Sequence, residues 1–247
     1  MWKSRRLQPE NRPFFELRET MTTLKDWQTY YALNRRGTRL AELGTRDAVA
    51  HLRNDPGLHR GSAVLDFGCG YFDVGLALAP HLARMDGLEI DDYSLRLARS
   101  RISDSPNTTI YASNDDVPAG TYDLVLANSV FQYLADDAEI VRTLERFHTW
   151  LKPDGAGRVL LIDLIPTGYS PPRDALRSMW VALCHGIPIT MARFLWSAAT
   201  SPHGRLWHRI DPSRVAELAA VAGFNCTRLS KNLTPSLQRY TCELTLR

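Results

Sequence analysis

The feature that most constrains the fold is a strand, a glycine turn and a helix start within residues 63–77, which read AVLDFGCGYFDVGLA. The first five residues are mostly apolar and place Asp66 near their end, a pattern typical of a buried parallel strand. Gly68 and Gly70 follow, and residues without a Cβ let the backbone turn tightly and approach a ligand closely. Asp73 is then predicted to cap a helix. This order predicts the opening unit of a nucleotide-binding α/β fold.

The charges beside the turn indicate which nucleotide binds. A dinucleotide-binding turn receives a pyrophosphate on its backbone N–H groups, and Asp66 would repel that group. The third glycine of G-x-G-x-x-G is also absent, because Asp73 stands there. S-adenosylmethionine carries no phosphate, and its cationic sulfonium and ammonium groups favour nearby acids. Glu89 ends the next apolar segment about 20 residues on, where a carboxylate would bind ribose hydroxyls.

Three motifs resemble those of class I S-adenosylmethionine-dependent methyltransferases. Residues 66–70 (DFGCG) resemble the first motif of the family. Residues 122–125 (YDLV) resemble its F/Y-D-x-V strand, and residues 151–155 (LKPDG) resemble its L-K-P-G-G turn. The chain departs from the family at Phe72, where a third glycine is usual. The ring there would either narrow the methionine end of the site or pack outward.

The resemblance implies an α/β fold with a doubly wound, Rossmann-like sheet of seven mostly parallel strands, the last one antiparallel, plus a helical cap. It also implies S-adenosyl-L-methionine as the cofactor. The adenine-binding acid of the family is displaced or replaced here, so Asn114 and Asp115 share that assignment. The cofactor-binding candidates are Asp66, Gly68, Gly70, Glu89, Ile90, Asn114, Asp115, Asn128 and Tyr31.

The predicted domains are an N-terminal helical cap segment, residues 1–60, and a methyltransferase domain, residues 61–247, with a cap insert at about 164–210. The insert follows a strand tip and is rich in Pro, Met and Trp, so it is predicted to cover the site with apolar walls. A homodimer interface and a plain helical cap are the alternatives for the insert. The substrate-binding candidates are Gln132, Tyr133, Trp180, Met191, Trp196 and Trp207.

An enclosed apolar site predicts a small or mid-sized organic acceptor, such as a specialised metabolite. Oxygen is favoured over nitrogen or carbon as the methylated atom, and an oxygen nucleophile would need a base. His208 is the first candidate because it lies just before the helix that starts at Asp211; His185 is the second, and His203 is also within reach. Two alternatives stay open: a protein that binds the cofactor without methyl transfer (a cyclase or binding module), and a methyltransferase of a macromolecule.

Composition narrows the partners further. Residues 62–165 hold 16 acidic and 8 basic side chains, while the flanking segments are basic, which fits either an anionic substrate or caps that complement the core. The basic residues are scattered without interleaved aromatics, so no nucleic-acid partner is expected. The four cysteines lack C-x-x-C spacing, so no metal site is expected. Residues 1–12 show no apolar signal segment and the apolar residues 181–200 are interrupted by charge and proline, so a cytoplasmic protein without membrane contact is expected.

Overall fold

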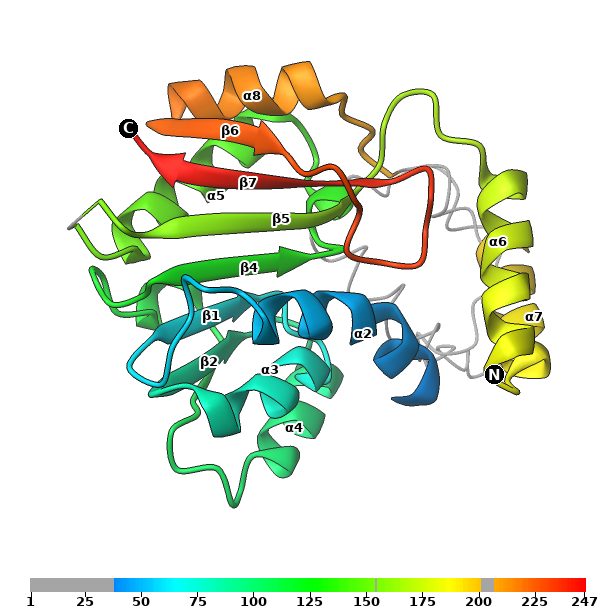
Figure 1. Cartoon of the computed structure of the whole chain (residues 1–247), viewed down its shortest axis with the longest axis horizontal. Helices are drawn as coiled ribbons and strands as arrows, with labels where there is room; N and C mark the ends of the chain where they lie inside the picture. Colours follow the sequence, from blue (N-terminus) through cyan, green and yellow to red (C-terminus); the bar gives the residue numbers. More distant parts are fainter. Residues whose placement is uncertain (1–37, 154, 201–206) are drawn as a thin grey trace, which may run out of the picture.

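A seven-stranded sheet forms the centre of the structure, a computed structural model that describes residues 38–153, 155–200 and 207–247. The strand order is β3-β2-β1-β4-β5-β7-β6. Strands β1 to β5 pair in parallel, β7 is antiparallel to β5, and β6 is antiparallel to β7. Within this sheet β7 therefore opposes the other strands, which confirms the predicted fold (Figure 1). The strands are β1 (Ala63–Phe67), β2 (Arg84–Leu88), β3 (Ile110–Tyr111), β4 (Leu124–Asn128), β5 (Arg158–Leu164), β6 (Phe224–Arg228) and β7 (Tyr240–Leu246).

Helices cover both faces of the sheet and also stand beyond its ligand-bearing edge. On one face lie α2, α3 and α4, and on the other lie α5 and α8. Helices α6 and α7 stand beyond the carboxyl ends of the parallel strands (Figure 1). The α-helices are α2 (Thr38–Arg53), α3 (Asp73–Leu78), α4 (Asp92–Arg101), α5 (Asp137–Trp150), α6 (Pro171–Cys184), α7 (Pro188–Thr200) and α8 (Pro212–Val221). Short 3-10 turns occur at η3 (Ala79–His81), η4 (Asn114–Asp116) and η5 (Phe131–Tyr133).

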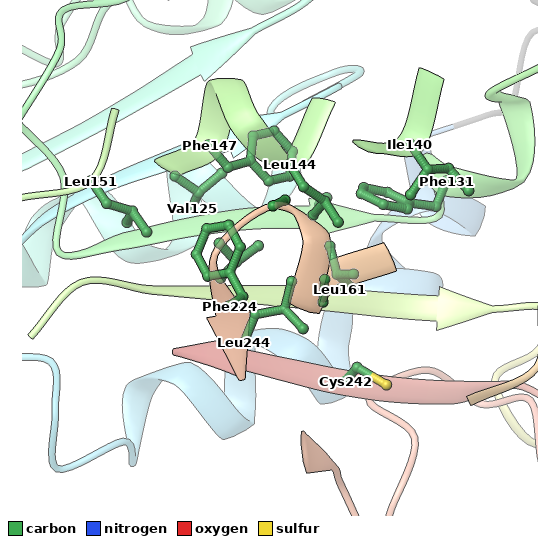
Figure 2. Packing of buried hydrophobic residues seen from close by; sticks show 14 of the residues in the cluster. Val125, Phe131, Ile140, Leu144, Phe147, Leu151, Leu161, Phe224, Cys242 and Leu244 are labelled. Atoms are coloured by element: carbon green, nitrogen blue, oxygen red, sulfur yellow. The ribbon is translucent and has the colours of Figure 1, made fainter. Parts of the chain in front are cut away.

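The two halves of the core share the same strands, since successive side chains of a strand point to opposite faces. In β4, Val125 joins the cluster that contains α5, whereas Leu124 joins the cluster beneath α2 and α3. Figure 2 shows Val125 of β4 close to Phe147 of α5. The Phe147 ring meets Phe67 edge-on, with centroids 4.9 Å apart. Burial on both faces explains why these strands are near-continuous apolar runs in the sequence.

The third strand is shorter than predicted. The β-branched residues within Thr108–Ala112 predict a strand, and the structure has only Ile110–Tyr111. The carbonyl oxygens of Asn107 and Thr109 accept N–H groups of β2, but the N–H of Thr108 donates to the Ser105 carbonyl and the N–H of Thr109 donates to Asp86 Oδ1. The ladder is therefore incomplete before Ile110.

The last two strands form a hairpin. The sequence predicts strands over roughly 225–231 and 237–246, and the structure has the shorter strands Phe224–Arg228 and Tyr240–Leu246. The intervening loop is held by its own polar side chains, including an Asn232 amide that donates to Thr234 Oγ1 at 2.7 Å. The loop therefore folds toward the site edge of the sheet rather than extending the ladder.

The sequence predicts a helix over Thr38–Arg53, which the turn cluster of residues 54–57 stops, and the structure confirms it with the same bounds as α2. A helix is also predicted from Leu24, which lies outside the described residues. The insert at about 164–210 contains α6 and α7, joined by the short turn around Gly186. Its role as a cap, and the division at residue 60, stay predictions.

Candidate active site

The glycine turn after β1 has the strained backbone that only glycine adopts freely. Gly68 and Gly70 have φ angles of 69° and 55°. A Cβ on Gly68 would lie 2.6 Å from Val130 Cγ2, so this position is closed by packing. A Cβ on Gly70 would meet no atom of the described chain within 4 Å. The turn therefore exposes its backbone to open space at Gly70, as a close-approaching ligand requires.

Glu89, just past the end of β2, stabilises this turn through hydrogen bonds to its carboxylate. Its Oε2 accepts the Gly70 N–H at 2.8 Å, and its Oε1 accepts the N–H groups of Ile90 and Asp91, each at 2.8 Å. The residue is 9% exposed, and this burial raises its pKa against the opposing effect of the three N–H donors. The carboxylate predicted to bind ribose thus also joins the glycine turn to the next strand tip.

Asp66 lies near the end of β1 and is 3% exposed. Burial, reinforced by the negative charges of Glu89 and Asp73, raises the pKa of Asp66 to about 8. Without a ligand the carboxyl group therefore holds its proton at neutral pH. A cationic ligand beside it would favour the ionised form.

We expect Asp66→Asn to flatten the pH dependence of stability. As the pH rises from about 4 to about 8, the unfolded chain releases this proton while the folded chain retains it, so the free energy of unfolding falls. The asparagine variant lacks that fall, and its stability relative to the parent should increase across this window. Urea unfolding at pH 5, 6.5 and 8 measures it, with Asp104→Asn, at an exposed loop position, as the control. Parallel curves for parent and variant would refute the assignment.

Phe72 occupies the position where the family has glycine, and its ring packs into the hydrophobic core. The side chain is fully buried and belongs to the cluster beneath α2 and α3. Its φ of 62° is left-handed, so the backbone keeps the conformation that a glycine would have. This geometry corrects the predicted helix cap: Phe72 holds the cap position without a side-chain bond, and Asp73 is the first helical residue. The Asp73 carboxylate instead pairs with Arg101 of α4 at 2.7 Å.

The adenine side of the site lies beyond β2 and β3. Ile90 is 36% exposed, which leaves its side chain available to a ring. Asn114 begins η4, and its Oδ1 is buried without a hydrogen-bond partner. Asp115 is exposed. Tyr31 lies outside the described residues.

The acceptor side lies beyond β4, where Asn128 ends the strand half-buried. Gln132 in η5 is 4% exposed, and its backbone carbonyl accepts the His208 N–H at 2.9 Å. This bond brings the chain returning from the insert, with Trp207, against the β4 loop. His208 Nε2 is 3.4 Å from Asp137 Oδ1 at the start of α5. Tyr133, the last residue of η5, is half-buried.

Four other candidates lie in or directly after the helices of the insert. Met191 is 6% exposed and packs with Ala182 inside the α6–α7 pair. Trp180 and Trp196 are 61% and 74% exposed. His185 ends α6 at the surface, with Nε2 3.0 Å from an Arg46 guanidinium nitrogen of α2. These four assignments stay predictions, and His203 lies outside the described residues.

Sequence reasoning missed a buried polar cluster at the ends of β4 and β5. Asp163 accepts hydrogen bonds from Ser129 Oγ at 2.8 Å, Arg239 Nη1 at 2.6 Å and Thr234 Oγ1 at 2.5 Å. Ser129 and Asp163 have φ angles of 58° and 71°, a strain that persists where surroundings enforce it and that concentrates at functional sites. Asp163 could have been identified, because an acidic residue near the end of an apolar strand is the same sequence signal that identified Asp66. Arg239 lies 76 residues from Asp163 and had no such signal.

This strand order, with an acid-flanked glycine turn after β1 and a carboxylate after β2, agrees with the fold that the sequence resemblance to class I S-adenosylmethionine-dependent methyltransferases implies. The family model of a methyltransferase domain matches residues 65–156. Over that region the chain is similar to methyltransferase domains.

Several known methyltransferases are similar to this chain in sequence or in structure. A malonyl-[acyl-carrier protein] O-methyltransferase from Halalkalibacterium halodurans is 30% identical over 101 residues, 38% of this chain, and the match spans 36% of that relative. The crystal structure of magnesium protoporphyrin IX methyltransferase from Synechocystis with bound SAH has a TM-score of 0.58 at 16% identity, covering 94% of this chain and 99% of that chain. Mitomycin 7-O-methyltransferase has a TM-score of 0.56 at 19% identity, covering 95% of this chain and 60% of that chain. The two structural matches show the shared fold.

None of the helices in the described residues is both long and apolar enough to cross a membrane. In the same part of the chain, no three His, Cys, Asp or Glu side chains are grouped as a metal site would need.

Proposed function

We propose that this protein is an S-adenosylmethionine-dependent methyltransferase acting on a small or mid-sized organic acceptor, with oxygen as the favoured methylated atom. The observation that best supports this proposal is the hydrogen bond from the Gly70 N–H to the Glu89 carboxylate. This bond places a buried carboxylate beside a glycine turn that faces open space. A carboxylate there can accept hydrogen bonds from ribose hydroxyls. The methyltransferase domain match supports the same reading.

The residues fit the cofactor on a second, independent point. Asn114 Oδ1 is a buried acceptor without a partner, which is costly in a native protein. The 6-amino group of adenine is a donor that would satisfy it. Asn114 rather than the exposed Asp115 is therefore the proposed adenine contact.

When bound, the cofactor supplies an electrophilic methyl group on a sulfonium. The chain's own part is to hold the two reactants in line and to exclude water, which can supply much of the acceleration. His208 is the proposed proton acceptor, because its backbone is fixed on Gln132 and its ring faces the Asp137 carboxylate. A carboxylate at this distance, 3.4 Å from Nε2, can orient the imidazole. Two of the similar proteins are named as O-methyltransferases, which supports an oxygen acceptor.

We expect Asn114→Ala to weaken binding of S-adenosylhomocysteine roughly tenfold, the effect of losing one buried hydrogen bond. Binding of S-inosylhomocysteine, which lacks the amino donor, should change little. Calorimetry with both ligands measures the difference, and Asp115→Ala serves as the neighbouring control. An equal loss for the two ligands would contradict the adenine contact while leaving the cofactor assignment intact.

Activity itself is tested by incubating the protein with labelled S-adenosylmethionine and a library of hydroxylated aromatic and polyketide-like compounds. Methylated product together with S-adenosylhomocysteine supports the proposal. Cofactor binding without transfer to any compound favours the non-transferring alternative.

A homodimer through the insert also stays a proposal, supported by apolar side chains that α6 and α7 expose, namely Leu176, Trp180, Leu183, Ile189 and Trp196.

A further inference from the structure

Buried polar atoms without partners mark one edge of the molecule. In the described residues these side-chain atoms are Asn114 Oδ1, Gln132 Oε1, Trp207 Nε1 and Arg239 Nε. Asn114 follows β3, and Gln132 follows β4. Trp207 belongs to the segment that returns from the insert, and Arg239 directly precedes β7, whose antiparallel direction places its start at the same edge. A buried polar atom without a partner is costly, so their location at one edge of the sheet indicates a common cause.

Three of these residues belong to one connected group on the acceptor side. The backbone of Gln132 is bonded to His208, next to Trp207, at 2.9 Å. The Trp207 ring centroid lies 5.4 Å from Arg239 Cζ. Tyr169 meets the Trp207 ring edge-on at 6.3 Å and lies 5.2 Å from the same Cζ. The group therefore combines two aromatic rings with three polar atoms that have no hydrogen-bond partner in the described residues: the N–H donors at Trp207 Nε1 and Arg239 Nε, and the acceptor Gln132 Oε1.

The charge of Arg239 is already matched. Its Nη1 donates to Asp163 at 2.6 Å, and its Nη2 lies 3.5 Å from Asp174 Oδ2. Both carboxylates are buried, at 5% and 8% exposure. One cation between two anions gives no attraction for a further anion. What Arg239 still offers is a directional N–H at Nε.

We propose that Gln132, Trp207 and Arg239 form the polar end of the acceptor site, and that the acceptor is an uncharged aromatic compound with a hydroxyl group there. A hydroxyl both accepts and donates, so it can take the Trp207 or Arg239 N–H and give its own proton to the Gln132 amide oxygen. The rings of Tyr169 and Trp207 supply the apolar contact. This inference rests on the proposed function, because it treats the group as the acceptor side of the cofactor site.

Three probes with the same ring test the proposal: 2-naphthol, 2-naphthoate and 2-methylnaphthalene, measured by ligand-observed NMR titration in the presence of saturating S-adenosylhomocysteine. We expect 2-naphthol to bind most tightly, roughly tenfold better than 2-methylnaphthalene, as about one net hydrogen bond predicts. Gln132→Leu and Trp207→Phe should each reduce that preference severalfold. Trp150→Phe removes an indole from the opposite end of the sheet and should preserve it.

The outcomes separate this inference from the proposed function. Equal affinity for 2-naphthol and 2-methylnaphthalene, tighter binding of 2-naphthoate, or no binding of any probe at millimolar concentration would overturn the acceptor class. S-adenosylhomocysteine affinity, measured in the same samples, should be unchanged in both site variants. Its loss would instead show that these residues hold the cofactor side together, and would also overturn the inference. If Trp207→Phe fails to fold, Gln132→Leu and Gln132→Met carry the comparison.

Discussion

Replacing Phe72 by glycine, the residue usual in the family, is expected to lower the free energy of unfolding by roughly 2–4 kcal/mol. Removing a fully buried phenyl ring costs about 3–5 kcal/mol through lost burial and a cavity. Relief of a left-handed non-glycine backbone returns about 1 kcal/mol, since φ is 62° here. The packing loss is larger, so restoring the family residue should destabilise this chain.

The neighbours of the Phe72 ring explain why its removal would leave a cavity. A Cβ on Gly75 would fall 2.1 Å from the Phe72 ring, and one on Gly87 would fall 3.0 Å from it. The ring therefore occupies space left by two residues without side chains, in α3 and in β2.

Phe72→Ala separates the two contributions, because alanine loses the ring and keeps the backbone strain. We expect it to be less stable than Phe72→Gly by about 1 kcal/mol. Urea unfolding with linear extrapolation measures all three proteins. A glycine variant as stable as the parent, or an alanine variant more stable than the glycine variant, would show that packing or strain has been misjudged.

The first strand and the glycine turn could be predicted because their signals are local. A strand buried on both faces leaves an apolar run, and a turn that needs φ > 0 leaves a glycine, so the turn at Gly68 and Gly70 follows from the residues themselves. The seven-stranded order was implied only by the family resemblance, and the role of Glu89 toward a cofactor stays a prediction. Helix α2 was bounded correctly by its periodic pattern and the turn after Arg53.

The acceptor side could not be predicted in the same way, because it depends on pairs far apart in the chain. Arg239 meets Asp163 and Trp207 through tertiary packing of the β6–β7 loop against the insert. The direction of a side chain is equally invisible: the sequence left open whether Phe72 entered the site, and the backbone angle with the space beside Gly75 decided it. Composition marked the aromatic residues of the insert without indicating which way Trp180 faces.

The largest expected effect on binding is that of Glu89→Ala, which should raise the dissociation constant for S-adenosylhomocysteine roughly 10- to 100-fold, or about 1.4–2.8 kcal/mol. The substitution removes the acceptor for the ribose hydroxyls. It also releases the Gly70 N–H and the two N–H groups that follow Glu89, so the turn loses its fixed position. Isothermal titration calorimetry measures the change directly.

Glu89→Gln shows whether charge and geometry both matter at this position. A glutamine places an NH2 group where one carboxylate oxygen now accepts a backbone N–H, so either Gly70 or the Ile90 and Asp91 pair faces a donor instead of an acceptor. We therefore expect a loss close to that of alanine, despite the similar size. Glu139→Gln is the matched control, because its carboxylate also accepts a backbone N–H, at 2.6 Å, at the start of a helix outside the cofactor side. Near-parent affinity in Glu89→Gln together with weak binding in Glu89→Ala would mean that side-chain volume, rather than the carboxylate, orders the turn.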